Sequence, residues 1–401
     1  MLFLVTVSVG LSKIQIGMAV PNPLRQIQEP VGATFISYGP DGTGVEVVES
    51  FGHYEAEYAA IRKGAAIFAM PERGLVEVEG TDRTEFLHRM VTNDTSTLEP
   101  GQGRRAFLLN NKGRIIADLI VLQAAERIWL DLDVFDAAQL KSELDRYLFT
   151  EDVTLCDQSA QYAHLSIHGP ASLKILEAAA ESAIPDLAPL AHTKVPICDS
   201  TCVVYRRDET GTPGLHVIAP VDSVESIYTR LADTVGGLVP DVDAAAGPGP
   251  KRALVGRAIG WSAYNIARIE AGTPLYHVDF GPDCLPHETG ILDEAVSFTK
   301  GCYCGQEIVA RMQSLGHPKR VLVGLGFADE RMPIAGAQVF AQPDREEAIG
   351  VVTSSTISPM LGGRAIAFAM VKWGRHRSGT SLAVWAEGEV TSATVQMLAF
   401  L

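Results

Sequence analysis

The pattern of secondary-structure signals changes at Arg320, and this change constrains the fold more than any other feature of the chain. From Arg320 to the C-terminus, short apolar runs alternate with turns that contain glycine and proline. Short strands separated by such turns are typical of barrels and sandwiches. The sequence therefore predicts a small all-β unit at the end of the chain, with strands at residues 321–327, 348–352, 364–371 and 382–385.

Upstream of Arg320, helical and strand patterns alternate along the chain. Asp82 is the predicted N-cap of one helix, and Glu85 three residues later would complete a capping box. Strands and helices follow one another in an order that predicts an α+β fold with antiparallel sheets rather than a doubly wound sheet. The helices are predicted near residues 53–66, 82–91, 140–147, 173–180 and 224–235, and the strands at 75–80, 107–110, 115–122, 163–167 and 202–206.

Length and charge limit the class of protein and its partners. A chain of 401 residues is long enough for about two or three domains. Its formal net charge of −15 disfavours nucleic acids and anionic membranes, because those partners need dense lysine and arginine faces. A small anionic ligand is compatible with this charge. The chain has 6 cysteines, which is too few for a disulfide scaffold, and we expect a reducing, cytoplasmic location.

Two segments are predicted to lie outside the folded units. Residues 1–17 are apolar, but they lack the basic start and the small-residue cleavage site of a signal peptide and are too short to span a bilayer. We expect them to be a non-native or disordered extension ahead of Met18, with a weak signal peptide as the alternative. Residues 245–250, AAGPGP, predict a flexible loop or a domain boundary.

The octet KGCYCGQE, residues 300–307, combines a cation, two thiols and two glycines between apolar segments. Glycine allows a close backbone approach, so we expect an exposed loop held at both ends. Three interpretations stay open. Cys302 could be a nucleophile, although no histidine lies in the loop. Cys302 and Cys304 could ligate a metal or an iron–sulfur cluster, which would need further donors. The residues alone favour the third, in which Cys302 is a tolerated, half-buried thiol and the loop serves backbone geometry.

Two charged residues in apolar surroundings are further candidates. Asp118 follows the turn 111–113 and sits inside an apolar strand, where a carboxylate is costly unless it is paired. It is either a structural acceptor or exposed residue, which this segment alone favours, or a ligand-binding residue that faces a cavity. Arg268 suits a planar, bidentate acceptor near the end of a short helix, and a surface charge pair with Glu270 is its default interpretation.

From Gly74 to Leu401 the order of segments resembles that of the folate-binding proteins built on the glycine-cleavage T-protein (aminomethyltransferase) fold. Within this superfamily the octet resembles the YgfZ branch, whose members bind tetrahydrofolate and are tied to the assembly or repair of iron–sulfur clusters. The matching segments are LHRMVTND, GQGRRAFLLNNKGRIIADLIVL, RIEAG, LPHETGIL, VSFTKGCYCGQEIVARM and GVVTSS.

The resemblance implies a fold and a ligand. The fold is a three-lobed ring, in which two ferredoxin-like α+β lobes and a C-terminal β-barrel surround a central folate channel. The two lobes would take residues 18–317 and the barrel residues 318–401. The implied cofactor is tetrahydrofolate or a folate derivative.

The resemblance also assigns residues to the site. Asp118 and Arg268 would contact the folate. Lys300, Cys302 and Tyr303 would form the signature loop at the mouth of the channel, with Lys300 and Tyr303 as further folate-binding residues. Cys302 and Asp118 are the predicted catalytic residues, and no metal ligands are predicted. Cys304 fills a variable position of the octet.

Two departures from the aminomethyltransferase pattern shape the predicted function. Ala117 and Asp118 stand where those enzymes carry an Asp-Asp pair, and Thr212 stands where they carry the acid of a Tyr-Thr-Gly-Glu stretch. Both departures favour a folate-binding protein that supports iron–sulfur cluster assembly or repair.

The alternative function is a folate-dependent one-carbon transferase of aminomethyltransferase or demethylase type. A third hypothesis is a scaffold that kept the fold and lost its ligand. The expected partners are folate and iron–sulfur client or assembly proteins, and the expected state is a monomer.

Overall fold

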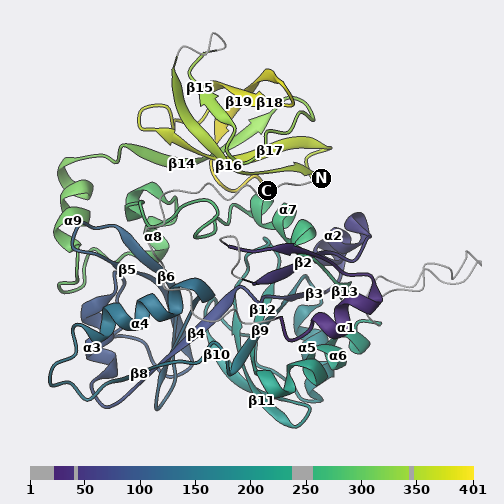
Figure 1. Cartoon of the computed structure of the whole chain (residues 1–401), viewed down its shortest axis with the longest axis vertical. Coiled ribbons are helices and arrows are strands. Elements are labelled where there is room, and N and C mark those ends of the chain that lie inside the picture. Colours follow the sequence, from purple (N-terminus) through teal and green to yellow (C-terminus); the bar gives the residue numbers. More distant parts are fainter. Residues whose placement is uncertain (1–21, 40–43, 237–255, 343–346) are drawn as a thin grey trace, which may run out of the picture.

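The structure is a computed structural model that describes residues 22–39, 44–236, 256–342 and 347–401. These residues form three lobes (Figure 1): two that are each built on a sheet, and a closed barrel that lies above both in this view. The predicted α+β class and the predicted all-β unit at the end of the chain are therefore confirmed. The segments 1–17 and 245–250 lie outside the described residues.

The first lobe is a five-stranded antiparallel sheet in the order β5-β6-β7-β4-β8. Two helices cover one face of this sheet, because alternate strand residues such as Val76 and Leu119 share a core cluster with Phe86 of α3 and Leu140 of α4. The elements are β4 (Arg73–Glu79), α3 (Arg83–Met90), β5 (Gln102–Leu109), β6 (Ile115–Gln123), β7 (Ile128–Asp133), α4 (Ala137–Asp145) and β8 (Thr154–Asp157).

The second lobe is a six-stranded sheet in the order β10-β11-β12-β9-β3-β13, antiparallel except for the pair β3–β13. Leu165 and Val217 of its strands pack with Ile175 of α5 and Ile227 of α6. The elements are β3 (Ala66–Ala69), β9 (Tyr162–His168), α5 (Ser172–Ala180), β10 (His192–Ile197), β11 (Ser200–Arg206), β12 (Gly214–Pro220), α6 (Val224–Thr234) and β13 (Arg257–Ala258).

The barrel closes because β14 pairs with β17 on one side and with β19 on the other. Its interior holds apolar residues such as Val339, Ala367 and Val384. The sequence patterns miss β15, which is short, and β19, whose polar residues alternate along the strand. The strands are β14 (Arg320–Phe327), β15 (Gln338–Phe340), β16 (Ala348–Ser358), β17 (Arg364–Lys372), β18 (Ser381–Ala386) and β19 (Glu389–Gln396).

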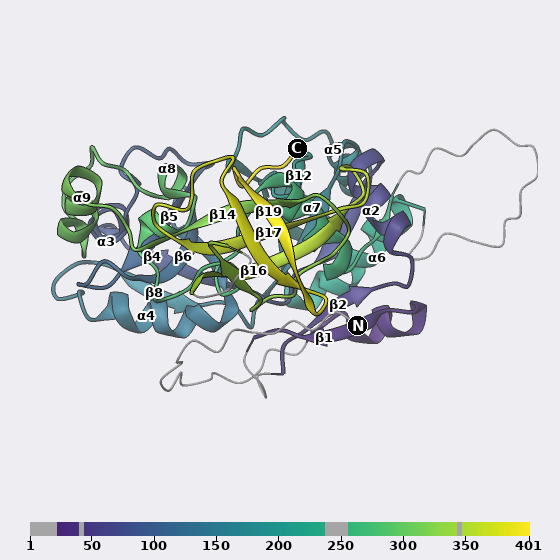
Figure 2. The same ribbon diagram turned by 90° about the horizontal axis from the view of Figure 1, so that it is seen from above.

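Further elements surround the lobes and connect them. Figure 2, the view from above, shows β1 and β2 along one side of the molecule and α8 and α9 beside the first lobe. Of the helices in the described part of the chain, none is long and apolar enough to span a membrane. These elements are α1 (Arg25–Gln28), β1 (Thr34–Ser37), β2 (Glu46–Ser50), α2 (Tyr54–Lys63), α7 (Trp261–Ala271), α8 (Leu292–Ala295) and α9 (Gln306–Leu315).

Asp82 stands at the predicted N-cap position of α3, but its side chain does not cap the helix. Within the described residues, Asp82 makes no side-chain bond to the first turn of α3. Its backbone angles, φ −93° and ψ 1°, differ from the extended conformation that aims an N-cap side chain at the helix. Instead, Asp82 Oδ2 accepts a hydrogen bond of 2.8 Å from the backbone N–H of Asp152, so this carboxylate ties the start of α3 to the segment before β8.

Each sheet has one face that the helices of its own lobe do not cover, and these two faces pack against each other. Leu75, Ile120 and Trp129 of the first lobe form one apolar cluster with Tyr205 and Ile218 of the second lobe. The strands are therefore buried on both faces, one under the helices of their own lobe and the other against the opposite lobe. We call this second face of each sheet the interlobe face.

Candidate functional site

Polar side chains gather on the interlobe face. In β9, His164, Ser166 and His168 are buried there and alternate with Leu165 and Ile167, which belong to the helix-covered core. Buried polar and charged groups are costly unless they are paired, and their concentration in one region marks a candidate functional site. The polar residues of this face include Arg73, Arg105, Asp118, Asp131, Asp133, His164, Ser166, His168, Tyr205 and His216.

Asp118 lies on the interlobe face of β6, opposite Phe107 of β5. Arg105 grips its carboxylate with two hydrogen bonds, since Nε donates to Oδ1 at 2.9 Å and Nη2 donates to Oδ2 at 2.6 Å. Nη1 of the same arginine lies 3.4 Å from Oε2 of Glu294 in α8. The carboxylate is therefore fixed in place, yet each of its oxygens has a further lone pair with which it can accept a hydrogen bond from a ligand.

Asp131 of β7 links the two lobes. Nε of Arg73 donates to its Oδ1 at 2.8 Å, and the Tyr205 hydroxyl of the second lobe donates to its Oδ2. Burial alone would raise the pKa of Asp131, but Arg73 and His164 lower it below its usual range. Burial lowers the pKa of His164 to about 4, so this imidazole is neutral at physiological pH.

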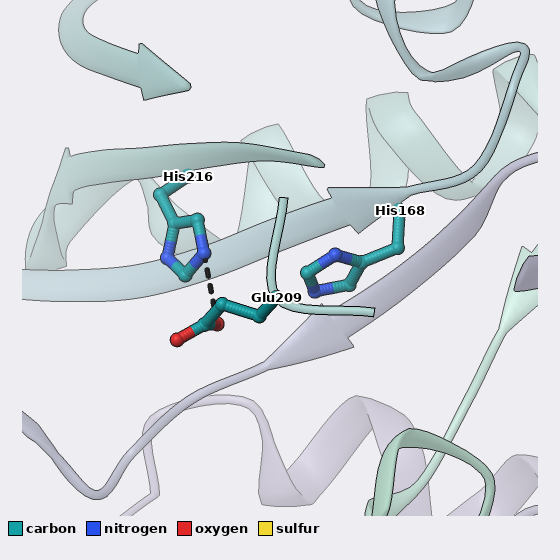
Figure 3. A group of neighbouring side chains, drawn as sticks. All are labelled: His168, Glu209 and His216. Carbon is teal, nitrogen blue, oxygen red and sulfur yellow. Dashed lines mark ion pairs between the residues drawn. The ribbon is translucent and has the colours of Figure 1, made fainter. Parts of the chain in front are cut away.

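Glu209 supplies a second buried carboxylate, in the turn between β11 and β12. Nε of Arg207 lies 3.0 Å from its Oε1, and the Tyr264 hydroxyl donates to its Oε2 at 3.0 Å. Two imidazoles lie beside it, His168 of β9 and His216 of β12 (Figure 3). Burial alone would raise the pKa of Glu209, but Arg207 and His216 bring it well below its usual range. The turn that carries Thr212 in place of an acid thus contains another acid, three residues earlier.

His277 and Asp136 form a separate ion pair near the start of α4. Nε2 of His277 lies 3.0 Å from both carboxylate oxygens of Asp136. Although burial lowers it, Asp136 raises the pKa of His277 to about 9. The imidazole is therefore protonated at neutral pH, and with Asp133 nearby this group forms a charge-paired cluster.

Arg268, a predicted folate contact, is fully buried in α7. Its guanidinium donates to Asn265, Asp279 and Ser354, at 2.9, 2.7 and 2.7 Å, and to the backbone oxygen of Thr273 at 3.1 Å. Ser354 belongs to β16, so Arg268 joins α7 to the barrel. The default interpretation, a surface pair with Glu270, is wrong, because Glu270 is also fully buried and bonds other partners.

The octet docks on the first lobe through Lys300, Tyr303 and Gly305. Lys300 Nζ donates to the backbone oxygens of His88 and Val91 at the end of α3, where a cation is favourable. Burial lowers the pKa of Lys300 to about 8. Tyr303 is buried in an apolar cluster, and its ring lies 5.1 Å from Lys300 Nζ. These contacts agree with the interpretation that the loop serves backbone geometry.

Gly305 explains why the octet needs a glycine before α9. Its φ of +80° lies in the left-handed region, and a Cβ there would stand 2.6 Å from the backbone oxygen of Asn110. The half-buried state predicted for Cys302 is wrong, because this thiol is exposed. Cys304 Sγ lies 3.9 Å from the Tyr147 hydroxyl. Tyr147 also lines a depression of about 260 Å³ between α3, α4 and the turn from β5 to β6.

The structure thus places the predicted site residues in three separate contact networks. Asp118 faces the opposite lobe, Arg268 joins α7 to the barrel, and the octet docks on the first lobe. Sequence reasoning missed His168, Glu209 and His216. The available signal was the regular alternation of histidine and serine with leucine and isoleucine in residues 164–168. Its meaning depends on the opposite sheet, which covers the polar face.

Comparisons with known proteins agree with this architecture. The chain matches the model of the GCVT N-terminal domain over residues 26–240 and that of the glycine cleavage T-protein C-terminal barrel domain over residues 320–401. It is 27% identical to the aminomethyltransferase of Bacillus subtilis, over 93% of this chain and 97% of the relative. It is 28% identical to a probable aminomethyltransferase of Halobacterium salinarum, over 95% and 98%.

A solved structure shares the fold. The aminomethyltransferase T of the glycine cleavage system from Bartonella henselae superposes with a TM-score of 0.80 at 24% sequence identity. The superposition covers 94% of this chain and 97% of that protein. The three-lobed arrangement is therefore shared over nearly the whole length of both chains.

Proposed function

The chain belongs to the glycine cleavage T-protein family, and on this basis we propose that it is a tetrahydrofolate-dependent one-carbon transferase of the aminomethyltransferase type. Tetrahydrofolate is the one-carbon carrier of this family. Relatives that match the chain over nearly its full length are named aminomethyltransferases, which favours this reading over a role in iron–sulfur assembly or repair.

The interlobe face offers groups that fit the polar ring of tetrahydrofolate, which carries both hydrogen-bond donors and acceptors. Glu72 Oε2 and His164 Nε2 are among the buried side-chain atoms that have no hydrogen-bond partner within the described residues. Burial raises the pKa of Glu72 to about 8, so its carboxyl group holds a proton at neutral pH. Unpaired buried polar atoms are costly, and a ligand that bonds them would remove that cost.

The single observation that carries the proposal is the position of Asp118. When bound, tetrahydrofolate supplies the nitrogen atoms that take up a one-carbon unit. The Asp118 carboxylate, fixed by the two hydrogen bonds from Arg105, can orient an amine or accept its proton. Glu209 provides a second buried acid in the second lobe, close to His168 and His216 and three residues before Thr212, which is not an acid. The departures at Ala117 and Thr212 therefore do not remove the acidic groups that such a site needs.

An activity assay tests the proposal. The purified protein, mixed with tetrahydrofolate and a panel of aminomethyl and methylamine donors, should form methylene-tetrahydrofolate. Asp118→Asn should lower the rate by about 100-fold or more, because it removes a positioned proton acceptor. Asp145→Asn, a change in an exposed carboxylate of α4, is the matched control and should leave the rate unchanged. A lack of product with every donor, together with measurable folate binding, would contradict the proposal.

The exposed thiol of the octet favours a second candidate, support of iron–sulfur enzymes. Lys300, Tyr303 and Gly305 of the octet dock on the first lobe, whereas Cys302 is exposed and Cys304 is half-buried two residues away. Thiolates ligate iron–sulfur clusters, and such a pair could hold one transiently with donors from a client protein. Lys300, Tyr303 and Gly305 would then serve to present the thiols.

Complementation separates the second candidate from the first. Cells that lack an iron–sulfur maturation factor of this family should regain iron–sulfur enzyme activity with the wild-type protein and with Cys156→Ala, a matched change in another exposed cysteine. Cys302→Ala should fail to restore it. Equal rescue by Cys302→Ala would remove this thiol from the mechanism, and a lack of rescue by the wild type would remove the role itself.

A further inference from the structure

We propose that His168, Glu209 and His216 form a binding site for a divalent transition-metal ion of the zinc(II) or iron(II) class. This inference does not rest on the proposed transferase activity. The three side chains come from β9, from the turn between β11 and β12, and from β12 (Figure 3). Two imidazoles and one carboxylate are the donor set of many catalytic zinc and non-haem iron(II) sites, which keep further coordination positions open.

The three donors already lie close together. One ligand atom from each residue lies within 4.8 Å of the others, and the side chains are buried. Metal–ligand bonds of about 2.1 Å in a tetrahedral site separate the donors by about 3.4 Å. The distances between the donors therefore need to shorten by about 1.4 Å at most.

A neighbouring hydroxyl leaves one ring nitrogen of His168 ready to bind a cation. Nε2 lies 2.9 Å from Ser166 Oγ, which can accept a hydrogen bond from a protonated Nε2. Nδ1 then carries the lone pair, and in the part of the chain that the structure describes it has no hydrogen-bond partner. A Cβ at Gly214 would stand 3.0 Å from Nδ1, so the glycine keeps the approach to this atom open.

His216 and Glu209 complete the donor set. Neither ring nitrogen of His216 has a hydrogen-bond partner within the described residues, although Nε2 lies 3.2 Å from Glu209 Oε2. Leaving a buried polar atom unpaired is unfavourable, and coordination to a metal would satisfy it. Arg207 and Tyr264 hold the carboxylate of Glu209, as neighbouring donors commonly do for ligating carboxylates.

The group formed by Asp133, Asp136 and His277 offers the same kinds of donor but fits a cation less well. His277 is already bonded to both oxygens of Asp136. Asp133 accepts hydrogen bonds from the Tyr38 hydroxyl and from the backbone N–H of Phe135. A metal would have to displace these bonds and a proton. At His168 it would instead meet an unpaired Nδ1, and at His216 it would displace only the 3.2 Å contact of Nε2 with Glu209.

Titration with cobalt(II), a spectroscopic probe, and with zinc(II) tests the site. The protein should carry serine in place of the four exposed or half-buried cysteines, Cys156, Cys198, Cys302 and Cys304, throughout, because accessible thiols also bind these ions. This form should bind one cobalt(II) per chain with visible absorption bands free of thiolate character, and zinc(II) should raise its unfolding temperature. His168→Asn and His216→Asn should each weaken binding at least about 10-fold. His192→Asn is the control, because His192 lies in the same sheet and its Nε2 contacts the backbone oxygen of Gln123 instead of the proposed site. This variant should bind cobalt(II) as tightly as the parent form.

The outcomes separate binding from misfolding and from adventitious binding. Circular dichroism and the unfolding temperature without metal show whether each variant is folded, and His168→Gln provides a second change at the same position. Failure of the parent form to bind cobalt(II) or zinc(II) would overturn the proposal. Equal binding by the parent and by a folded His168 or His216 variant would overturn it as well, since the ion would then lie elsewhere.

Discussion

Arg105 determines how Asp118 can bind a ligand. Its guanidinium donates one hydrogen bond to each carboxylate oxygen, and each oxygen keeps a further lone pair that can accept a hydrogen bond from a ligand. Both side chains are nearly buried, so neither charge is well solvated. Removal of one partner from a buried ion pair leaves the other charge uncompensated. The pair therefore fixes the geometry of the candidate site and makes its stability depend on both residues.

Arg105→Leu should lower the free energy of unfolding by about 3 kcal/mol or more, because it leaves Asp118 unpaired. The double variant Arg105→Leu, Asp118→Leu should recover a large part of that loss, since it removes both charges. Urea denaturation of the two single variants and the double variant measures this coupling. If the double variant is as unstable as the sum of the single variants, the two side chains do not interact as described.

Asp118 could be singled out from the sequence, whereas His164 and His168 could not, because a local pattern does not show which face of a strand is buried. A lone carboxylate within the apolar run of β6 stands out in any reading of the strand. His164, Ser166 and His168 instead alternate with Leu165 and Ile167, which is also the pattern of a strand with one face in water. Only the packing of the opposite sheet shows that this face is buried. Distant contacts of this kind are not encoded in any local pattern.

At the scale of elements, α7 holds the barrel against the second lobe. Arg268 donates to Ser354 of β16, and Glu270 accepts from Ser358 of the same strand and from Tyr58 of α2. Gly272 ends the helix with φ +81°, and a Cβ there would stand 2.5 Å from the backbone of Ala399. The last turn of α7 therefore packs closely against the end of the chain.

Arg268→Met tests whether Arg268 is mainly a structural tie or a folate contact. The structural contacts predict a fall in the free energy of unfolding of about 3–5 kcal/mol, because Asp279 would remain buried without its partner. Chemical denaturation and folate titration of the same variant distinguish the two roles. A large loss of folate affinity with unchanged stability would instead support the direct contact predicted from the resemblance.

The ion pair of His277 and Asp136 makes stability depend on pH. The folded-state pKa of His277, about 9, lies above its ordinary value of 6.5, so the protonated ring stabilises the fold. This contribution is fully present below pH 6.5 and is lost as the pH rises through 9. The unfolding temperature should therefore fall between these pH values, and His277→Gln should show a smaller fall. If the unfolding temperatures of the wild type and of His277→Gln fall equally with pH, the ion pair is not the cause of the pH dependence.

Helices and strands whose apolar residues recur at a regular spacing were predicted, whereas a strand that contains charged residues was missed. Helices α4, α5 and α6 lie where their apolar periodicity indicated, within a few residues. Strand β7, with the sequence IWLDLD, was missed because its two aspartates suggest a loop. They are tolerated in the strand since Asp131 and Asp133 accept hydrogen bonds from Tyr205 and Tyr38, which are distant in the sequence.

At the scale of the whole molecule, the two sheets and the barrel meet around a region rich in charged groups, although the protein as a whole is acidic. The division into a folate-binding region of two lobes, residues 18–317, and a barrel, residues 318–401, remains a proposal. The contacts of Asp131 with Tyr205 and of Arg268 with Ser354 cross between lobes. A ligand bound between the lobes would therefore stabilise all of them together.

Titration calorimetry with tetrahydrofolate tests the central claim most directly, that the interlobe face binds folate at Asp118. We predict saturable binding of one tetrahydrofolate per chain by the wild type and by the control Asp145→Asn. Asp118→Asn should weaken the affinity by about 10-fold or more, equivalent to the loss of a charge-assisted hydrogen bond of about 1.5–3 kcal/mol. Absence of binding by the folded wild type would contradict the claim, as would an affinity of Asp118→Asn equal to that of the wild type.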